Sequence, residues 1–282
     1  MGGIAGKFVI CMDVKMDILW NAYTDTGKEK NINQDAACVK RAKSPIGSIS
    51  MAVICDGIDG LDKGELASST VIKAFNSWFD YQLPIIIENG MENQNKDIWK
   101  VLIKEIKENW KRIIQEVNGK MIQYGKEKKC RLGTTVTALL ILDEYCFLIL
   151  HMGDSRIYLI RNKIKQLTRD HTVTALEVAQ GKISKEEAKQ DPRKYNLLQC
   201  VGLVEGIAPD IMIDTIQNGD VFLLCTEGFY NKNFPSKLFD VFYSVELKDK
   251  ETISKKIKGI CEQNKEAGEK DNMTAVVLKV NI

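Results

Sequence analysis

The sequence predicts an α+β fold, in which strands pair mainly antiparallel and helices occupy separate stretches. Three observations favour this class. First, apolar runs of strand length and helical patterns occur in separate runs along the chain and do not alternate as in a parallel βαβ fold. Second, 282 residues with 44% hydrophobic and 28% charged side chains are enough for one large core or two smaller ones. Third, neither an internal repeat nor a low-complexity linker divides the chain.

The first elements of the chain are a strand and two helices. An apolar run predicts a strand over 49–55, followed by a glycine-rich loop and a helix over about 65–80. The clearest element is a helix over about 97–123, because its apolar side chains recur at helical spacing and form one face. We interpret this face as core. Its members are Ile98, Leu102, Ile106, Trp110, Ile113, Val117 and Met121.

The middle of the chain is rich in strands. Apolar runs at 134–142 and 145–151 are separated by a short acidic turn, and further runs follow at 156–160 and 164–168. Short polar connections of this kind join antiparallel neighbours. The four runs therefore predict an antiparallel meander.

A polar segment over 172–193 follows the meander and is predicted to lie on the surface. Within it, Ser184 and Glu187 have the spacing of a capping box, which predicts the start of a short helix. The chain then returns to regular structure. The last predicted elements are a strand at 221–225, a helix near 251–264 and a strand at 273–280.

The charge and cysteine content exclude several classes of protein. Lys and Arg number 40 and Asp and Glu 38, so the net charge of +2 gives no reason to expect nucleic acid or an anionic membrane as a partner. No apolar stretch approaches the roughly 20 residues of a membrane span, and the N-terminal residues lack the pattern of a secretory leader. Eight cysteines without C-x-x-C spacing and two histidines predict reduced thiols and no zinc cluster. We therefore expect a cytoplasmic protein.

Four acidic residues stand at the ends of predicted strands. Asp56, Asp154 and Glu227 each follow an apolar strand, and Asp271 directly precedes the last one. If these strand ends converge, their mutual repulsion requires divalent cations to hold them together. Ligands that are all oxygen favour magnesium or manganese over zinc. The pattern therefore predicts a site for hard divalent cations.

Six segments of the chain carry a combined signal: TDTGKEKNINQDA (24–36), VICDGIDG (53–60), RLGTTVTALL (131–140), GDSRIYLI (153–160) with QLTRDHT (166–172), GDVFLLCTEG (219–228) and EKDNMTAVVL (269–278). Taken together and in this order, they resemble the type 2C metal-dependent serine/threonine protein phosphatases (the PPM family), in their bacterial form. The resemblance extends over nearly the whole chain, and six ordered segments are far more specific than any single Asp-Gly pair.

The resemblance implies a fold and a division of the chain. The family fold is a pair of antiparallel β-sheets packed as a sandwich with helices on both outer faces. The whole chain, 1–282, corresponds to a single phosphatase-like domain, and residues 172–193 correspond to the flap beside the active site.

The resemblance also implies the residues of a metal centre with two Mn²⁺ or Mg²⁺ ions. Asp56 would bridge the two ions and the Gly57 carbonyl would bind one of them. Glu227 and Asp271 would complete the protein ligands, and Asp154 would hold a third, weaker ion.

The reaction implied by the resemblance is hydrolysis of phosphoserine and phosphothreonine on proteins. A hydroxide bridging the two metals would attack the phosphorus in line, because paired cations lower the pKa of a shared water. Lys30 would balance the charge of the phosphate, and Asp35 would lie next to the metal ligands without binding an ion itself. The implied partners are phosphorylated proteins that are targets of a serine/threonine kinase; the sequence does not indicate an oligomeric state.

Four positions depart from the family pattern. Lys30 stands where Arg is usual, so the phosphate would be held by a single ammonium group and not by two parallel N–H donors of a guanidinium group. Glu227 stands where Asp is usual and is longer by one methylene, and Gln34 replaces Glu. Asp59 replaces Gly and is either a further ligand or a solvated loop residue. Lys30 and Glu227 together leave an alternative open, namely a catalytically weak or inactive relative that binds phosphoproteins or acts as a regulatory module.

Overall fold

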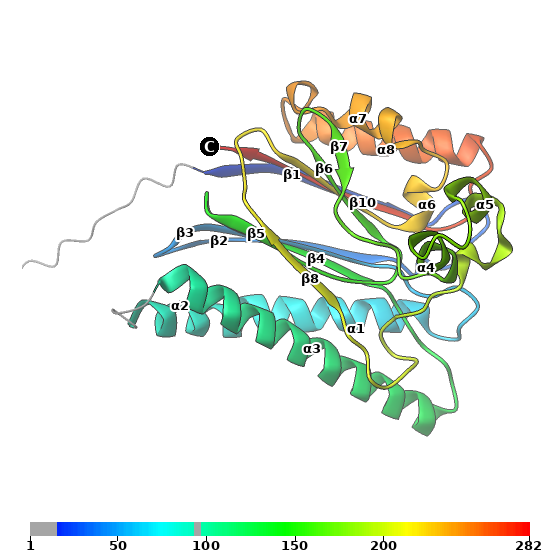
Figure 1. The fold of residues 1–282 in the computed structure, drawn as a ribbon, viewed down its shortest axis with the longest axis horizontal. Coiled ribbons are helices and arrows are strands. Elements are labelled where there is room, and N and C mark those ends of the chain that lie inside the picture. Colours follow the sequence, from blue (N-terminus) through cyan, green and yellow to red (C-terminus); the bar gives the residue numbers. More distant parts are fainter. Residues whose placement is uncertain (1–15, 93–96) are drawn as a thin grey trace, which may run out of the picture.

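The computed structural model describes residues 16–92 and 97–282, so the expectation about an N-terminal leader falls outside the described residues. Two five-stranded antiparallel sheets pack face to face, as expected for the sandwich (Figure 1). The first sheet has the strand order β1 (Asp17–Asp25), β10 (Met273–Asn281), β9 (Val221–Cys225), β6 (Arg156–Ile160) and β7 (Ile164–Gln166). The second has the order β2 (Ala36–Ser44), β3 (Gly47–Cys55), β4 (Val136–Leu142), β5 (Cys146–Met152) and β8 (Asp210–Asp214).

Helices cover both outer faces of the sandwich and one of its ends (Figure 1). The second sheet is covered by α1 (Gly64–Ser77), α2 (Leu83–Glu92) and α3 (Ile98–Lys128). The first sheet is covered by α7 (Pro235–Phe242) and α8 (Lys250–Glu266). Three short helices lie at one end of the sandwich, namely α4 (Val173–Ala179), α5 (Lys185–Gln190) and α6 (Glu227–Tyr230).

The core consists of three apolar layers. The layer between the two sheets includes Ile54 and Leu139 from one sheet and Leu224 and Val276 from the other, all fully buried. In the layer under α3, Trp110 packs edge-on against Trp78 with 5.6 Å between ring centroids. Strands buried on both faces read as continuous apolar runs, which is why the central strands could be predicted.

The four strands from 134 to 168 do not form one meander, and that prediction was wrong. β4 and β5 pair in the second sheet, whereas β6 and β7 pair in the first. The chain crosses between the sheets at Gly153, whose φ is +114°, a conformation that favours glycine. A Cβ atom there would also lie 2.5 Å from Cγ2 of Thr135. This crossing brings Asp154 to the edge between the sheets.

The predicted helix over 65–80 is the first part of a longer helical segment. α1 passes through a π-helical turn, Trp78–Gln82, into α2. Pro84 has no N–H to donate to the preceding turn, and its position near the start of α2 accounts for the break in the regular α ladder. α3 begins where predicted, with the Asp97 side chain accepting from the backbone N–H of Trp99. It extends to Lys128, five residues past the predicted end.

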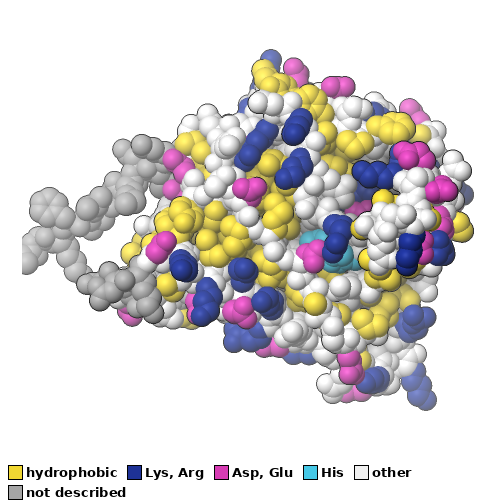
Figure 2. All heavy atoms as spheres, in the orientation of Figure 1, with side chains coloured by type: hydrophobic (Ala, Val, Ile, Leu, Met, Phe, Trp, Pro, Cys, Tyr) yellow, Lys and Arg dark blue, Asp and Glu magenta, His cyan; other side chains and the backbone are white. Residues whose placement is uncertain are grey.

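The surface has mixed charge, as the balanced composition indicates. Basic, acidic and apolar side chains are interspersed on the face shown in Figure 2. Of the helices in the described ranges, none is both long and apolar enough to cross a membrane.

Candidate metal centre

The acidic residues predicted from strand ends lie at one edge of the sandwich. β2 and β3 are antiparallel with Ala36 opposite Cys55, so Asp35 before β2 and Asp56 after β3 share an edge. β9 and β10 are antiparallel with Cys225 opposite Ala275, so Glu227 and Asp271 share an edge in the same way. The two edges meet where the Thr226 hydroxyl donates to Asp35 across the sheets, at 2.9 Å.

The electrostatics of Asp56 show that all these carboxylates lie within interaction range. Burial raises the pKa of Asp56 well above its usual value, and the charges of Asp35, Asp154, Asp271 and Glu227 raise it further. These four include every other acidic residue predicted for the site. The structure therefore brings the predicted set together around Asp56.

Two further carboxyl groups of the cluster have raised pKa values. Burial raises the pKa of Asp154 to about 7, with Asp170 the next contributor. Burial also raises the pKa of Glu227 to about 8, and the charges of Asp154 and Asp271 act in the same direction. Like charges that are forced together and shielded from water favour the protonated form until a cation compensates them. A bound cation would therefore relieve the repulsion between these carboxylates.

The carboxylate oxygens of the cluster are chemically suited to a hard divalent cation, but their present spacing does not form a complete binding site. Within the described residues, no three His, Cys, Asp or Glu side chains have a spacing that could hold a metal ion. One carboxylate oxygen of Asp35, Oδ1, is buried without a hydrogen-bond partner in the described structure. Carboxylate oxygens are the ligands that magnesium and manganese prefer, and the unpartnered oxygen of Asp35 adds to the uncompensated negative charge beside them. The residues present fit such an ion, with side-chain adjustment needed to bind it.

Gly57 follows Asp56 in a crowded part of the backbone. A Cβ atom at this position would lie 2.7 Å from the backbone of Gly64 and 2.8 Å from the carbonyl oxygen of Gln34. Its N–H donates to that same Gln34 carbonyl at 3.2 Å. Only glycine therefore allows the Asp56–Gly57 turn to approach its neighbours so closely.

Lys30 contacts two acidic residues. Its amino group lies 2.7 Å from Oδ2 of Asp59 and 3.4 Å from Oδ1 of Asp271. The Asp59 side chain is 69% exposed, so it is a loop residue that pairs with Lys30. The contact with Asp271 puts the predicted phosphate-binding cation beside the carboxylate cluster.

The segment of Asp154 is held by a network that the sequence predicted only in part. Arg156 makes a double hydrogen bond to Asp170, with its Nη2 at 2.6 Å from Oδ2, and so braces this loop. Its guanidinium also stacks on the Tyr230 ring, 3.7 Å from the centroid. The Tyr230 hydroxyl donates to the Asp154 carbonyl at 3.1 Å. α6 therefore links Glu227 at its first position to the Asp154 loop, a role of Tyr230 that no sequence pattern revealed.

Asp271 is held by its chain neighbours. The N–H of Asn272 donates to Oδ1 of Asp271 at 2.8 Å, whereas the Asn272 side chain bonds to the backbone of Gln34 and Thr26. The backbone of Asn272, and not its side chain, therefore orients Asp271. Buried Glu269, which the sequence analysis did not select, accepts from the N–H of Asp271 at 3.3 Å.

Both histidines have structural contacts. His171 Nδ1 accepts from the Gly153 N–H at 3.3 Å, and its Nε2 lies 3.2 Å from Asp210. His151 is 1% exposed and lies between the Thr137 hydroxyl and the Arg169 carbonyl. These contacts give both histidines structural roles.

Residues 172–193 form a separate excursion of α4 and α5 beside the cluster. The predicted capping box is present, because Ser184 accepts from the Glu187 N–H and Glu187 bonds back to Ser184. Arg193 closes the excursion by pairing with Glu177 at 2.8 Å and Asp191 at 2.7 Å.

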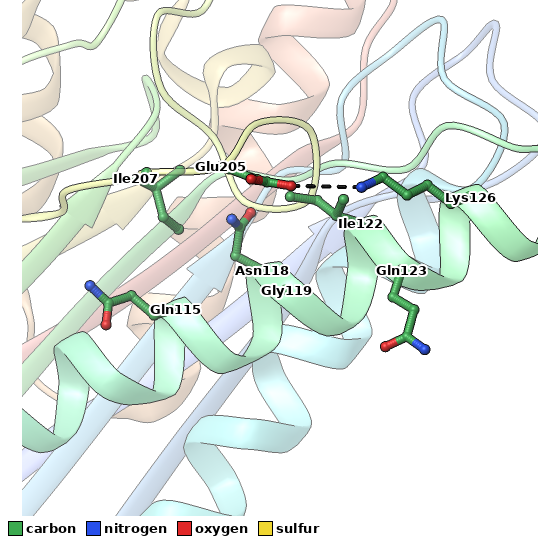
Figure 3. Close-up of a pocket in the computed structure, with 9 residues that line it drawn as sticks. Gln115, Asn118, Gly119, Ile122, Gln123, Lys126, Glu205 and Ile207 are labelled. Carbon is green, nitrogen blue, oxygen red and sulfur yellow. Dashed lines mark ion pairs between the residues drawn. The ribbon is translucent and has the colours of Figure 1, made fainter.

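A cavity of about 430 Å³ lies away from the carboxylate cluster, between α3 and the loop at 205–207 (Figure 3). Two of its lining residues, Lys126 and Glu205, form an ion pair at 3.6 Å, and Asn118 projects from α3 toward the loop. The cavity is lined mainly by uncharged side chains, so the carboxylate cluster is the better candidate for chemistry.

The two-sheet sandwich and its edge of carboxylates define the class of metal-dependent protein phosphatases. Residues 26–276 match the family described as Protein phosphatase 2C. The chain therefore belongs to the protein phosphatase 2C family, as its sequence segments indicated.

Individual relatives agree with this assignment. The serine/threonine phosphatase stp of Listeria innocua is 29% identical over 269 residues, which cover 92% of this chain and 94% of that protein. The serine/threonine phosphatase Stp1 from Staphylococcus aureus has a crystal structure with a TM-score of 0.77 at 25% identity, covering 95% of this chain and 97% of that one. The catalytic domain of the phosphatase PstP, solved in complex with two manganese ions, has a TM-score of 0.70 at 22% identity, covering 95% and 100%. The family and the α+β sandwich are both confirmed.

Proposed function

We propose that the chain is a metal-dependent protein phosphatase that hydrolyses phosphoserine and phosphothreonine on proteins with two Mn²⁺ or Mg²⁺ ions. The observation that carries this proposal is the set of acidic side chains from both sheets gathered around Asp56. Membership of the protein phosphatase 2C family supports the reaction class. The alternative of an inactive phosphoprotein-binding relative rests only on the departures at Lys30 and Glu227, and the comparisons with known proteins add nothing in its favour.

The residues proposed to hold the two ions are Asp56, the Gly57 carbonyl, Glu227 and Asp271. Asp154 is proposed to hold a third ion. No hydrogen bond to the Gly57 carbonyl occurs in the described part of the chain, which supports its availability as a ligand. When bound, divalent cations lower the pKa of water and stabilise charge on phosphate oxygens.

Two further side chains have proposed roles in the reaction. Lys30 donates to a phosphate oxygen from its place beside Asp271. Asp35 accepts a hydrogen bond from the Thr226 hydroxyl on one oxygen, and its other oxygen is buried without a hydrogen-bond partner; we place it beside Asp56, behind the metal ligands. Neither residue needs to form a covalent bond with the substrate.

Glu227 is proposed to bind a metal despite its extra methylene. It occupies the first position of α6, where the chain leaves β9. The longer side chain changes the ligand position by about 1.5 Å unless the backbone moves away, which is large against the ±0.2 Å tolerance of metal–oxygen distances. The consequence is weaker metal binding than an aspartate at 227 would give.

The remaining proposals concern the context of the enzyme. We treat 1–282 as one phosphatase-like domain with 172–193 as its flap, supported by the apolar layer that both sheets share. The phosphoprotein substrates are proposed to be targets of a serine/threonine kinase. Free cysteines, seven within the described ranges, support a cytoplasmic location.

The test is release of phosphate from a phosphothreonine peptide during a titration with Mn²⁺. Asp56→Asn removes the proposed bridging charge and should lower the rate by at least about 100-fold, more than loss of an outer-shell partner typically costs. Asp240→Asn, at an exposed position of α7, is the matched control and should keep the wild-type rate. Equal rates in the wild type and Asp56→Asn would contradict the proposal.

A further inference from the structure

The amino group of Lys30 is shared between two carboxylates of unequal exposure. Asp59 is the nearer at 2.7 Å and its side chain is 69% exposed, whereas Asp271 lies at 3.4 Å and is 33% exposed. Lys30 itself is 24% exposed, so few other groups can reach it. An anion that approaches Lys30 from solvent therefore meets Asp59, which is the nearer and the more exposed of its two partners.

The loop that carries Asp59 is fixed on both sides and open at its tip. Ile58 donates to the Gly133 carbonyl at 3.0 Å, and Asp62 donates its N–H to the Arg131 carbonyl at 3.0 Å. Between these anchors, Gly60 has φ +75° and a Cβ atom there would meet nothing within 4 Å. The Asp59 carboxylate can therefore leave Lys30 without loss of packing.

We propose that Asp59 competes with the substrate phosphate, and with the product phosphate, for Lys30. This inference rests on the proposed function, in which Lys30 binds a phosphate oxygen. A phosphate monoester brings negative charge to the same amino group, so Asp59 opposes it both by occupying Lys30 and by repulsion. The effect acts on substrate and transition state alike, so it raises KM and leaves kcat unchanged.

Asp59→Asn tests this competition in steady-state kinetics with a phosphothreonine peptide and Mn²⁺. Exposed ion pairs shift an equilibrium by up to about five-fold, so KM should fall about two- to five-fold with kcat unchanged. The inhibition constant of inorganic phosphate should fall by the same factor. An unchanged or higher KM in Asp59→Asn would overturn the inference.

Glu29→Gln is the matched control. Glu29 is adjacent to Lys30 in the chain but pairs with Lys270 at 3.0 Å, and both of those side chains are more than half exposed. The variant makes the same change in net charge without freeing Lys30, so its KM should stay at the wild-type value. An equal fall of KM in Glu29→Gln would assign the effect to net charge and overturn the inference.

A binding measurement separates this inference from the proposed reaction. Fluorescence anisotropy of a labelled peptide with a non-hydrolysable phosphonate in place of phosphoserine needs no turnover. Asp59→Asn should bind the phosphonate peptide about two- to five-fold more tightly than the wild type does. In a protein that already carries Lys30→Gln, adding Asp59→Asn should leave the affinity for this peptide unchanged. If the protein releases no phosphate but the variants bind the phosphonate peptide as expected, only the proposed reaction is refuted. If Asp59→Asn tightens binding equally in the presence and absence of Lys30, or if no variant binds the phosphonate peptide, the competition is refuted.

Discussion

At the scale of single residues, the carboxylate cluster lowers the stability of the fold and is therefore best explained by a function. Asp56, Asp154 and Glu227 all have raised pKa values because burial and like charges disfavour their ionised forms. A chain selected for stability alone has no reason to gather acidic groups in this way. The cluster is explained when cations compensate the charge, which strengthens the proposed metal centre.

Glu227→Asp should bind Mn²⁺ more tightly than the wild type, by about three- to ten-fold, or about 1 kcal/mol. The shorter side chain removes the displacement of the ligand oxygen from the position expected for the family. Calorimetric titration measures the change directly. Exposed Glu246→Asp makes the same chemical change away from the site and should have no effect; weaker binding by Glu227→Asp would contradict the prediction.

His151 should make the protein less stable in mild acid. Burial lowers its pKa to about 4, with the charge of His171 acting in the same direction and Asp170 opposing it. The unfolded chain takes up a proton near pH 6.5 and the folded chain only near pH 4, so the stability from neutral His151 is lost as pH falls through this window. Between pH 7 and pH 5 the loss is about 2 kcal/mol.

Urea unfolding of the wild type and His151→Gln at these two pH values measures this contribution. Glutamine keeps a donor and an acceptor but does not titrate in this range, so the variant should lack about 2 kcal/mol of the pH dependence. The comparison between the two proteins cancels the carboxylates, which titrate in both. The same pH dependence in both proteins would show that His151 is not the group responsible.

At the scale of elements, α6 joins the two halves of the site. It begins at Glu227, directly after β9, and ends at Tyr230, whose hydroxyl reaches the Asp154 carbonyl. At Gly228, an added Cβ atom would lie 2.2 Å from the carbonyl oxygen of Asn272, the residue just before β10. That atom belongs to the backbone, so a larger residue can be accommodated only if α6 moves away from β10.

Gly228→Ala should therefore destabilise the protein by about 2–4 kcal/mol and weaken metal binding, because it displaces Glu227. Gly259→Ala is the matched control, since Gly259 lies inside α8 with nothing within 4 Å of its added Cβ. Alanine there should stabilise the protein by about 0.5–1 kcal/mol. Thermal unfolding of both variants measures the contrast, and equal shifts would contradict the role given to Gly228.

The elements that sequence reasoning predicted are those whose burial leaves a pattern. β3, β4 and β9 are buried along nearly their whole length and read as apolar runs. β1, β2 and β8 lie at sheet edges, and β2 in particular is half-buried or exposed throughout, with Lys40 and Arg41 in the middle. Edge strands carry such charges to discourage pairing with other chains, which removes the apolar signal. β2 was missed for that reason, whereas β1 and β8 carry charges only at their end residues and were missed because no long apolar run marks them.

At the scale of the whole molecule, the site exists only because the two sheets pack together. The hydrogen bond from Thr226 to Asp35 joins residues 191 positions apart, one from each sheet edge. The sequence predicted which acidic residues stand at strand ends, and the family resemblance predicted their roles. It could not reveal that Lys30 pairs with Asp59, or that Tyr230 reaches Asp154, because these contacts depend on how loops from different sheets meet.

The central claim is that the gathered carboxylates form a centre for divalent cations, and calorimetric titration of Mn²⁺ into the metal-free protein tests it most directly. The wild type should bind about two ions per chain with micromolar or tighter affinity, as expected for a two-metal hydrolase. Asp56→Asn should lose most of this binding while keeping its fold by circular dichroism, and Asp240→Asn should bind like the wild type. Absence of binding by well-folded wild-type protein, or equal binding by Asp56→Asn, would contradict the account.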